Sequence, residues 1–358
     1  PRARDLTSFY LALAAGGSLG GMLVTLVAPL VFTRYTELPL FVLLVPALVT
    51  LALLRDAARR RGRIPALVWA IPCATFSIAA AISLSRPASS LEVASARNFY
   101  GTLRVFQDRP STPRGIRAFY HGRTVHGSQF IAEADSMRPT ANYAEGTGIE
   151  LAFREHSRRV AGLPLQIGVI GLGPGSIIAW SKPGDAFRFF ELNPQVVDFA
   201  QRYFTYLRQS PASIDIVTGD ARLSLERELA SGPHHRYDLF TVDAFSSGSI
   251  PLHLLTRESF ALYRQALAPN GVIAFHISNV YLDLRPVIRG LARESGMKVL
   301  ELVSAPDPGR AAAWSTWVLV TDDPAFVSRT TPLVPVDETD GRSLVWTDDF
   351  SSLSSVIR

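Results

Sequence analysis

The sequence predicts an α/β protein in which N-terminal transmembrane helices and a small β-rich subdomain precede a mostly parallel, doubly wound sheet. Three observations lead to this fold class. Long runs without a charged residue occupy positions 6–33, 38–54 and 64–85. From position 166 onward, short apolar runs rich in β-branched residues alternate with helical patterns. The first of these short runs ends in a glycine-rich turn that contains Gly171, Gly173 and Gly175.

The three charge-free runs contain 28, 17 and 22 residues, which meets or approaches the length that a helix needs to cross a bilayer. A signal peptide would supply only one such run, so we predict that residues 1–85 form a transmembrane helical region. A very apolar soluble bundle is the alternative. Glycines at positions 16, 17, 20 and 21 favour either close packing against a second helix, in a homodimer or a membrane complex, or a kinked helix near Pro29.

Composition excludes several classes of site. Cys73 is the only cysteine, so the chain has no internal disulfide and no cysteine-based metal site. The seven histidines lack metal-ligand spacing, and we predict no metal. The net charge of +5 owes much to the arginine-rich stretch 55–63. Such a loop between apolar runs is typical of a membrane-topology signal, and we predict no nucleic-acid partner.

Residues 91–160 are predicted to form the small β-rich subdomain. Apolar and polar side chains alternate over 102–105 and 117–120, and Gly122 and Gly127 mark turns. The pattern predicts a helix over 141–160 that leads into the main sheet.

The main sheet is expected within residues 161–325, followed by a C-terminal tail over 326–358. Asn193-Pro194 is a strong helix start, because asparagine caps helices and proline suits their first turn. Another helix is expected to end at Pro269-Asn270. The expected strands are 166–170, 189–191, 214–217, 237–242, 271–276, 299–302 and 317–320.

Three carboxylates follow successive predicted strands: Glu191, Asp220 and Asp243. Ligands of open α/β sheets bind at the carboxyl ends of the strands. An acid about 20 residues after a glycine turn accepts hydrogen bonds from ribose hydroxyls. The order therefore predicts a nucleoside site, with Glu191 at the ribose, Asp220 at the adenine and Asp243 at the reacting end. A tight turn without a ligand, or acids that only cap helices, is the structural alternative.

Several segments resemble the spermidine synthase (polyamine aminopropyltransferase) family, which joins a small β-domain to a methyltransferase-like Rossmann domain. The similar segments are 220–222 (Asp-Ala-Arg), 242–247 (Val-Asp-Ala-Phe-Ser-Ser) and 267–279. With the apolar N-terminus, the chain resembles bacterial membrane-fused spermidine-synthase-like proteins, through segments 16–21, 126–129, 275–279 and 346–350. This resemblance covers nearly the whole chain and implies that residues 161–325 are the catalytic domain.

The resemblance implies roles for individual residues. Asp243 matches a catalytic aspartate that orients and deprotonates an attacking amine, and Tyr143 matches a catalytic tyrosine. Two family positions differ, since Ala144 replaces a histidine and Ser246 replaces a second aspartate. The positions that match the family's cosubstrate-binding residues are Gln129, Gly171, Gly173, Gly175, Glu191, Asp220 and Ala221.

The resemblance implies a transferase that uses S-adenosylmethionine or its decarboxylated form and moves an aminopropyl-type group to an amine, with release of methylthioadenosine. A lyase or methyltransferase, or a structural subunit of a membrane complex, remains an alternative because the acceptor half of the site differs from the family. His253, His276 and the pair Asp348-Asp349 either rebuild that half or serve as surface, packing and tail residues.

The resemblance also implies an integral protein of the bacterial inner membrane that contacts the lipid bilayer. The arginine-rich stretch 55–63 is expected in the cytoplasm. A third crossing would then place the catalytic domain outside, away from cellular S-adenosylmethionine. We expect a cytoplasmic catalytic domain, which requires one apolar run to be re-entrant or interfacial.

Overall fold

The structure is a computed structural model that describes residues 5–59, 71–79, 82, 91–109, 111–112, 115–232, 236–244, 251–330 and 342–358. The chain divides into two compact units, Pro1–Arg104 and Val105–Arg358. The division falls inside a strand of the small subdomain, later than the predicted end of the transmembrane region at residue 85.

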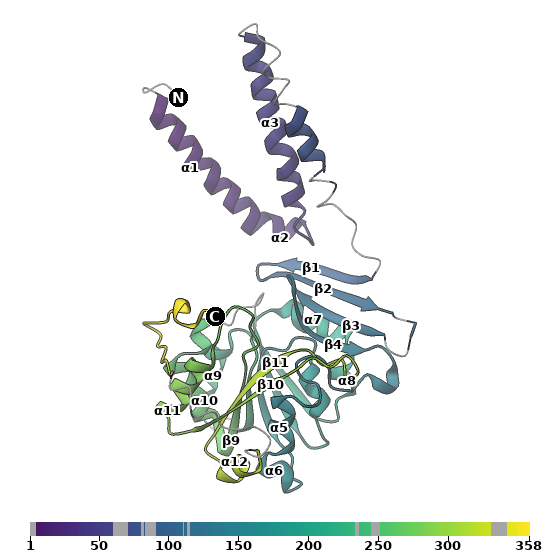
Figure 1. The fold of residues 1–358 in the computed structure, drawn as a ribbon, viewed down its shortest axis with the longest axis vertical. Coiled ribbons are helices and arrows are strands. Elements are labelled where there is room, and N and C mark those ends of the chain that lie inside the picture. The colour runs from purple at the N-terminus through teal and green to yellow at the C-terminus, as the bar shows by residue number, and fades with distance from the viewer. Residues whose placement is uncertain are drawn as a thin grey trace. The chain divides into compact units, whose positions relative to one another are not determined.

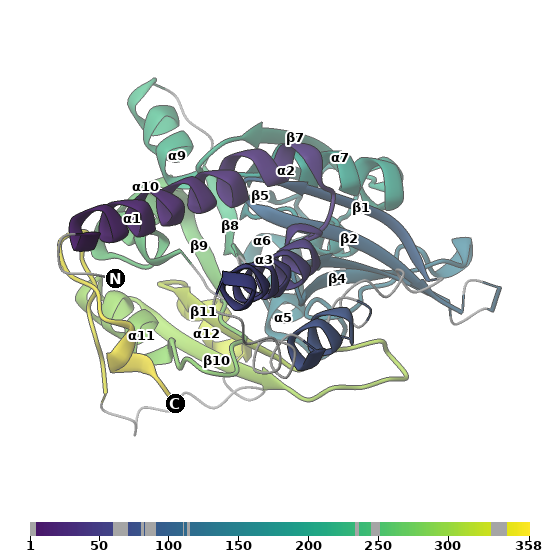
Figure 2. The ribbon, with the colours of Figure 1, turned by 90° about the horizontal axis from the view of Figure 1, so that it is seen from above.

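The first unit begins with a continuous helix built from α1 (Leu6–Met22), the π-helical turn η2 (Leu23–Val27) and α2 (Ala28–Val31). The π turn ends at Val27, two residues before Pro29, whose ring and missing N–H disturb the hydrogen bonds of the preceding turn. Helix α3 (Glu37–Arg59) follows, and α1 and α3 diverge from the corner at residues 32–36 in both views (Figures 1 and 2). A helical segment over residues 71–79 belongs to the third apolar run, most of which lies outside the described residues.

Among the described residues, the helix Leu6–Val31 alone is long and apolar enough to cross a membrane, and only 6% of its apolar window is buried. A signal sequence passes the same test of length and hydropathy. The apolar stretch Glu37–Ala52 is shorter. A Cβ atom added at any of the four glycines of α1 would meet no atom within 4 Å, so the close helix packing expected there stays a prediction.

A buried ion pair fixes the corner between α2 and α3 to strand β1 (Glu92–Asn98). Arg97 Nη1 lies 2.8 Å from Glu37 Oε2, and both side chains are at most 10% exposed. Arg97 also donates to the Arg34 carbonyl at 3.0 Å, and Arg34 pairs with Glu92 at 2.7 Å. Breaking one partner of such a pair leaves an uncompensated buried charge, so these contacts hold the corner in place.

The predicted β-rich subdomain contains a four-stranded sheet in the order β1-β2-β3-β4. Its other strands are β2 (Gly101–Asp108), β3 (Ile116–His121) and β4 (Thr124–Phe130), and the short helix η3 (Glu133–Asp135) follows. Strands β2 and β3 contain the two stretches predicted from alternation. The pairing of β3 with β4 is antiparallel and shifts register at Phe119/Tyr120.

The helix predicted over residues 141–160 is wrong in extent. The structure has two short helices, α5 (Gly148–Arg154) and α6 (Ser157–Val160), while residues 141–147 form turns and a bridge. His156 breaks the run because it is extended and its Nδ1 caps α6 by accepting from the Arg158 N–H. Ala141 bridges to Ala312, so a tertiary contact replaces helical hydrogen bonds at the other end.

A seven-stranded sheet forms the centre of the second unit and is flanked by helices (Figure 1). Its order is β10-β11-β9-β8-β5-β6-β7, with β11 antiparallel to both neighbours and the β9-β8-β5-β6-β7 pairs parallel. The elements are β5 (Gln166–Ile170), η4 (Ser176–Trp180), β6 (Ala186–Glu191), α7 (Pro194–Tyr203), α8 (Tyr206–Gln209), β7 (Ser213–Thr218), α9 (Ala221–Ala230), β8 (Tyr237–Val242), η5 (Leu252–Leu254), α10 (Arg257–Ala266), β9 (Leu267–His276), α11 (Arg285–Glu294), β10 (Lys298–Ser304), β11 (Ser315–Thr321), α12 (Pro324–Thr330) and η6 (Leu353–Val356).

Two helix ends show how local sequence signals compare with the structure. Asn193 caps α7 as predicted, and its side chain accepts from the Gln195 N–H. The helix end predicted at Pro269-Asn270 is wrong, because α10 stops at Ala266 and these two residues lie inside β9. Asn270 has a positive φ of 64°, so the turn signal marks an irregularity within the strand.

Residues 342–358, part of the predicted C-terminal tail, pack on the second unit. Trp346 and Val356 are buried in its hydrophobic core, at 2% and 1% exposure. Asp348 accepts two hydrogen bonds from Arg222, at 2.6 and 2.5 Å, and one from Thr256 at 2.9 Å. The hydrogen bonds from Arg222 lower the pKa of Asp348 to about 2.

We expect Asp348→Asn to lower the free energy of unfolding at pH 7 by about 0.5–1 kcal/mol, since this ion pair is partly exposed. The folded pKa lies below the ordinary value of 3.8, so the stabilisation is complete above about pH 5 and is lost as pH falls towards 2. Urea unfolding at pH 7 and pH 3 measures this effect. The difference in the free energy of unfolding between Asp348→Asn and the parent protein should be smaller at pH 3 than at pH 7. Asp349→Asn is the control. An equal difference at both pH values would contradict the assignment.

Candidate active site

Residues at the ends of the parallel strands come together along one edge of the seven-stranded sheet. The β5/β6, β5/β8 and β8/β9 pairs end in register. Gly171 follows β5, Glu191 ends β6, Asp220 follows β7, Asp243 follows β8 and His276 ends β9. Carboxyl ends of parallel strands are where open α/β sheets bind ligands, so this edge is the candidate active site.

The glycine loop after β5 needs glycine at two positions for different reasons. Gly171 has a φ of +92°, and a Cβ added there would lie 2.3 Å from the Asp243 carbonyl oxygen. Gly175 has a φ of +87°, but an added Cβ would lie no closer than 3.4 Å to another atom. Gly171 therefore allows the ends of β5 and β8 to approach closely, whereas glycine is favoured at position 175 because of its left-handed backbone conformation. Gly173, with a φ of +53°, lies between them.

Glu191 is tied to the glycine loop. Its carboxylate accepts from the backbone N–H of Leu172 at 2.9 Å and of Asn193 at 2.8 Å. Burial raises the pKa of Glu191, and the backbone hydrogen bonds partly offset this. A carboxylate has about four acceptor positions, so Glu191 can hold the loop and still accept from ribose hydroxyls.

Asp220 is the N-cap of α9 and accepts from the Leu223 N–H at 3.0 Å. Its other carboxylate oxygen lies 3.1 Å from Nε2 of His253. Ala221 is the first residue of α9 and is buried in the core. The structure thus places Asp220 and Ala221 at the predicted strand end, with His253 as an added neighbour.

Asp243 lies at the centre of a hydrogen-bonded chain. The Tyr143 hydroxyl donates to Oδ2 of Asp243. Nδ1 of His276 lies 2.7 Å from Oδ1, and Nε2 of His276 lies 2.6 Å from Oγ of Ser278. Ser278 Oγ also accepts from the Thr316 N–H at 2.8 Å. The serine hydroxyl can then donate to Nε2, which fixes the tautomer of His276 that donates from Nδ1 to Asp243.

Electrostatic interactions within this set of hydrogen-bonded residues keep Asp243 ionised and Tyr143 protonated. Burial opposes ionisation of Asp243, but His276 and the hydrogen bonds from His276 and Tyr143 outweigh it and lower the pKa of the carboxyl. Burial, together with the charge of Asp243, raises the pKa of Tyr143 well above its ordinary value. Tyr143 therefore acts as a hydrogen-bond donor at neutral pH.

Two tryptophans that sequence reasoning did not identify hold this chain in position. Trp180 donates from its indole N–H to the carbonyl of Tyr143 at 2.8 Å. Trp317 donates to the carbonyl of Asn142 at 2.9 Å and stacks on the ring of His276, with centroids 4.7 Å apart. Both tryptophans come from segments distant in sequence from the residues they orient, so no local pattern marks them.

His126 is a further site residue without an assigned role in the sequence analysis. Its Nε2 is buried and has no hydrogen-bond partner in the described part of the chain. Burial and the neighbouring His121 lower its pKa to about 4, although Asp243 opposes this shift. His126 is therefore neutral at pH 7. Its carbonyl oxygen lies 3.2 Å from the position of a Cβ on Gly173, so β4 packs against the glycine loop here.

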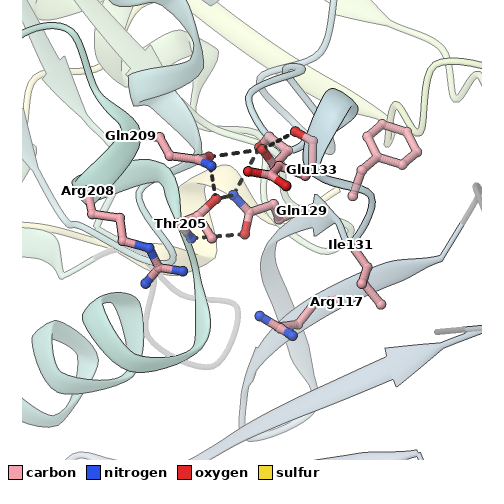
Figure 3. A pocket seen from close by; sticks show the side chains of 9 residues that line it. Arg117, Gln129, Ile131, Glu133, Thr205, Arg208 and Gln209 are labelled. Carbon is pink, nitrogen blue, oxygen red and sulfur yellow. Dashed lines mark hydrogen bonds between the residues drawn. The ribbon is translucent and has the colours of Figure 1, made fainter. Parts of the chain in front are cut away.

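Gln129 lies in a separate polar cavity of about 240 Å³ (Figure 3). Its amide nitrogen donates to the Ser136 carbonyl at 2.9 Å and to Thr205 Oγ1 at 2.8 Å. Its amide oxygen accepts from the Thr205 N–H at 3.0 Å. These bonds tie β4 to the start of α8. None of the strand-end residues lines this cavity, which is formed by Arg117, Gln129, Phe130, Ile131, Glu133, Ser136, Thr205, Arg208 and Gln209.

Two further residues that the sequence analysis named for the acceptor half of the site differ in their positions. His276 lies in the active site, whereas Asp348 forms an ion pair with Arg222. Ser246 lies outside the described residues. Among the residues that the structure describes, no group of three or more histidine, cysteine, aspartate or glutamate side chains is arranged to hold a metal ion.

Comparison with known proteins shows several curated relatives. A stretch of 192 residues is 30% identical to the polyamine aminopropyltransferase of Vibrio vulnificus (strain CMCP6), covering 51% of this chain and 62% of that protein. A stretch of 115 residues is 28% identical to a probable polyamine aminopropyl transferase of Bifidobacterium longum (strain NCC 2705), covering 31% and 24%. The chain thus spans less than two thirds of the length of either relative. No family model matches the chain.

A solved structure shares the fold. The probable spermidine synthase from Corynebacterium glutamicum ATCC 13032 aligns with a TM-score of 0.53 and 17% identity, over 75% of this chain and 99% of the other. At this identity the likeness shows the fold alone. The α/β, Rossmann-like architecture with a mixed sheet is therefore confirmed, and the resemblance to aminopropyltransferases is supported by the curated relatives.

Proposed function

We propose that this protein is a spermidine synthase-like transferase that moves an aminopropyl-type group from decarboxylated S-adenosylmethionine, or a related group from S-adenosylmethionine, to an amine. The observation that carries this proposal is the ionised Asp243 carboxylate, held by Tyr143 and His276 beside the glycine loop and Glu191. The sequence relatives named polyamine aminopropyltransferases support the same reaction class.

The proposed reaction assigns distinct tasks to the residues of the site. Glu191 and Asp220 would bind the nucleoside, and Asp243 would orient the amine. The amine nitrogen attacks the carbon next to the sulfonium sulfur, so a C–N bond forms and a C–S bond breaks. The electron pair of that bond returns to sulfur, which leaves as methylthioadenosine. Asp243 stabilises the positive charge that develops on nitrogen and takes the proton that the nitrogen loses.

Product analysis by mass spectrometry tests this proposal. The full chain is incubated with each of the two donors, with and without a panel of amines. Methylthioadenosine together with an aminopropylated amine is the expected result. A methylated product would instead establish a methyltransferase, and methylthioadenosine without an alkylated amine a lyase. Binding without turnover would identify a structural subunit, and each of these three outcomes overturns the proposal.

A matched variant tests the donor site separately. Glu191→Gln should weaken donor binding about 10- to 100-fold, the loss of one charge-assisted hydrogen bond. Isothermal calorimetry with methylthioadenosine measures this effect. Asp198→Asn is the control, because Asp198 on α7 is partly exposed and forms an ion pair with its helical neighbour Arg202. Equal affinity of the parent and Glu191→Gln would show that Glu191 serves the loop and not the ribose.

We also propose that the helix Leu6–Val31 anchors the protein in a bacterial inner membrane, with the sheet domain in the cytoplasm where the donor is made. The length and exposed apolar surface of this helix support the anchor. Alkaline phosphatase and green fluorescent protein fused after Arg358 report the side of the membrane. Activity of the phosphatase fusion alone would overturn the cytoplasmic placement, and recovery of the protein in the soluble fraction would overturn the anchor.

A further inference from the structure

The cavity around Gln129 brings together two arginine side chains from different elements. Arg117 comes from β3 and Arg208 from α8, and both line this cavity of about 240 Å³ (Figure 3). Burial and the neighbouring charge of Arg208 lower the pKa of Arg117, so the two positive charges act on each other. Glu133 is the acid among the lining residues, and it is exposed. The lining residues therefore carry a net positive charge, and a bound anion would reduce the repulsion between the arginines.

Arg117 is held in place and keeps spare hydrogen-bond donors. Its Nη1 donates to the carbonyl of Tyr203, the last residue of α7. The amide oxygen of Gln107 accepts from Nε at 2.9 Å and from Nη2 at 2.5 Å when that amide is oriented to match these donors. A guanidinium carries five N–H groups, so these contacts leave two N–H groups of Arg117 for a ligand.

A series of hydrogen bonds fixes the orientation of the Gln209 amide. The Gln129 amide is oriented by backbone groups, because its oxygen accepts from the Thr205 N–H at 3.0 Å and its nitrogen donates to the Ser136 carbonyl at 2.9 Å. The same nitrogen donates to Thr205 Oγ1 at 2.8 Å, so the Thr205 hydroxyl donates in turn to Oε1 of Gln209 at 2.7 Å. The oxygen of the Gln209 amide is thus used within the protein, and the two N–H groups of this lining residue are left as donors.

These donors favour a phosphate group. Arg117, Arg208 and Gln209 offer N–H groups from three separate side chains, and the three free oxygens of a phosphate monoester can each face a different one. A carboxylate has only two oxygens, which lie in one plane with its carbon. Phe130 and Ile131 line the same cavity and supply apolar surface. Because the cavity volume is several times the roughly 30 Å³ that a water molecule occupies in the liquid, an organic substituent fits beside the phosphate.

We propose that this cavity binds the phosphate group of a small phosphate monoester, with its oxygens on Arg117, Arg208 and Gln209 and its organic part against the two apolar side chains. The site does not depend on the proposed aminopropyl transfer, since none of the strand-end residues lines this cavity. It also gives Gln129 a task away from the donor, because the Gln129 amide orients the hydrogen bonds that end at Gln209.

Calorimetry on the full chain in detergent, at low ionic strength, tests the ligand class with phenyl phosphate, inorganic phosphate and benzoate. We expect phenyl phosphate to bind with a Kd below about 1 mM, and the other two probes to bind about 10-fold or more weakly. Benzoate binding as tightly as phenyl phosphate would overturn the phosphate assignment. Equal affinity for inorganic phosphate would overturn the ester, and absence of binding of every probe at about 10 mM would overturn the site.

Two variants test whether binding takes place in this cavity. Gln209→Glu keeps the oxygen that accepts from Thr205 and replaces the amide nitrogen with an anionic oxygen, which repels phosphate. Arg208→Gln removes an exposed cation. Each variant should weaken phenyl phosphate about 10-fold or more, the effect of one lost charge-assisted hydrogen bond, while thermal unfolding confirms that it folds. Arg202→Gln is the matched control, since Arg202 is exposed on α7, and should bind as the parent does.

Methylthioadenosine separates this cavity from the donor site. Its Kd should stay within about 2-fold of the parent value in both Gln209→Glu and Arg208→Gln. Unchanged affinity of both variants for phenyl phosphate would mean that the probe binds elsewhere as an adventitious ion only, which overturns the proposal. Parallel loss of phenyl phosphate and methylthioadenosine binding would assign the cavity to the donor and overturn it as well.

Discussion

Replacing Asp243 with asparagine is expected to lower kcat about 1,000-fold, within the range for loss of a positioned general base. Asparagine has nearly the same shape, and its amide can still bond to Tyr143 and His276. The negative charge is lost, however, and with it the attraction for the amine and the acceptor for its proton. Methylthioadenosine formation under saturating donor and amine measures kcat.

The binding of methylthioadenosine to Asp243→Asn should stay within about 3-fold of the parent, because Glu191 and the glycine loop are unchanged. Asp215→Asn is the matched control, since Asp215 lies exposed on β7 and pairs with Arg188. Its kcat should equal that of the parent. A kcat for Asp243→Asn within 10-fold of the parent would remove Asp243 from the chemistry and favour a role in packing.

The strand edge that forms the site could be predicted because local signals determine it. Apolar β-branched runs specify buried strands, and a glycine turn or an acid marks where each strand ends. Parallel strands then bring Gly171, Glu191 and Asp243 to the same edge, whatever the details of the intervening helices. The structure places the three predicted carboxylates, Glu191, Asp220 and Asp243, at ends of the parallel strands.

Contacts between distant segments could not be predicted in this way. The residues that complete the Asp243 hydrogen-bonded chain come from β9, the segment that follows β9 and the turn that contains Tyr143. The stacking of Trp317 on His276 depends on the antiparallel strand β11. The resemblance implies that Gln129 lies at the donor, whereas in the structure its amide group bonds to Thr205 and Ser136. Such contacts depend on tertiary packing, which produces no hydrophobic periodicity and no motif spacing in the sequence.

The two glycine variants of the loop should differ in stability by several degrees of melting temperature. Gly171→Ala combines a left-handed backbone, which costs about 1–2 kcal/mol, with a Cβ placed 2.3 Å from the Asp243 carbonyl oxygen. Overpacking against backbone adds about 1–3 kcal/mol, so we expect a total loss of about 2–5 kcal/mol. Gly175→Ala has the same backbone cost without a clash, and about 1–2 kcal/mol is expected.

Thermal and urea unfolding of the two variants separate the effect of the close approach from that of backbone geometry. Because each kcal/mol shifts the melting temperature of a unit of this size by about 2–4 °C, the extra 1–3 kcal/mol of Gly171→Ala should be resolved. The clash also pushes on Asp243 itself, so Gly171→Ala should lower kcat more than Gly175→Ala does, even well below the melting temperature. Equal losses of stability and activity in the two variants would mean that β8 moves freely at this point, and that the position of Asp243 does not depend on the glycine beside it.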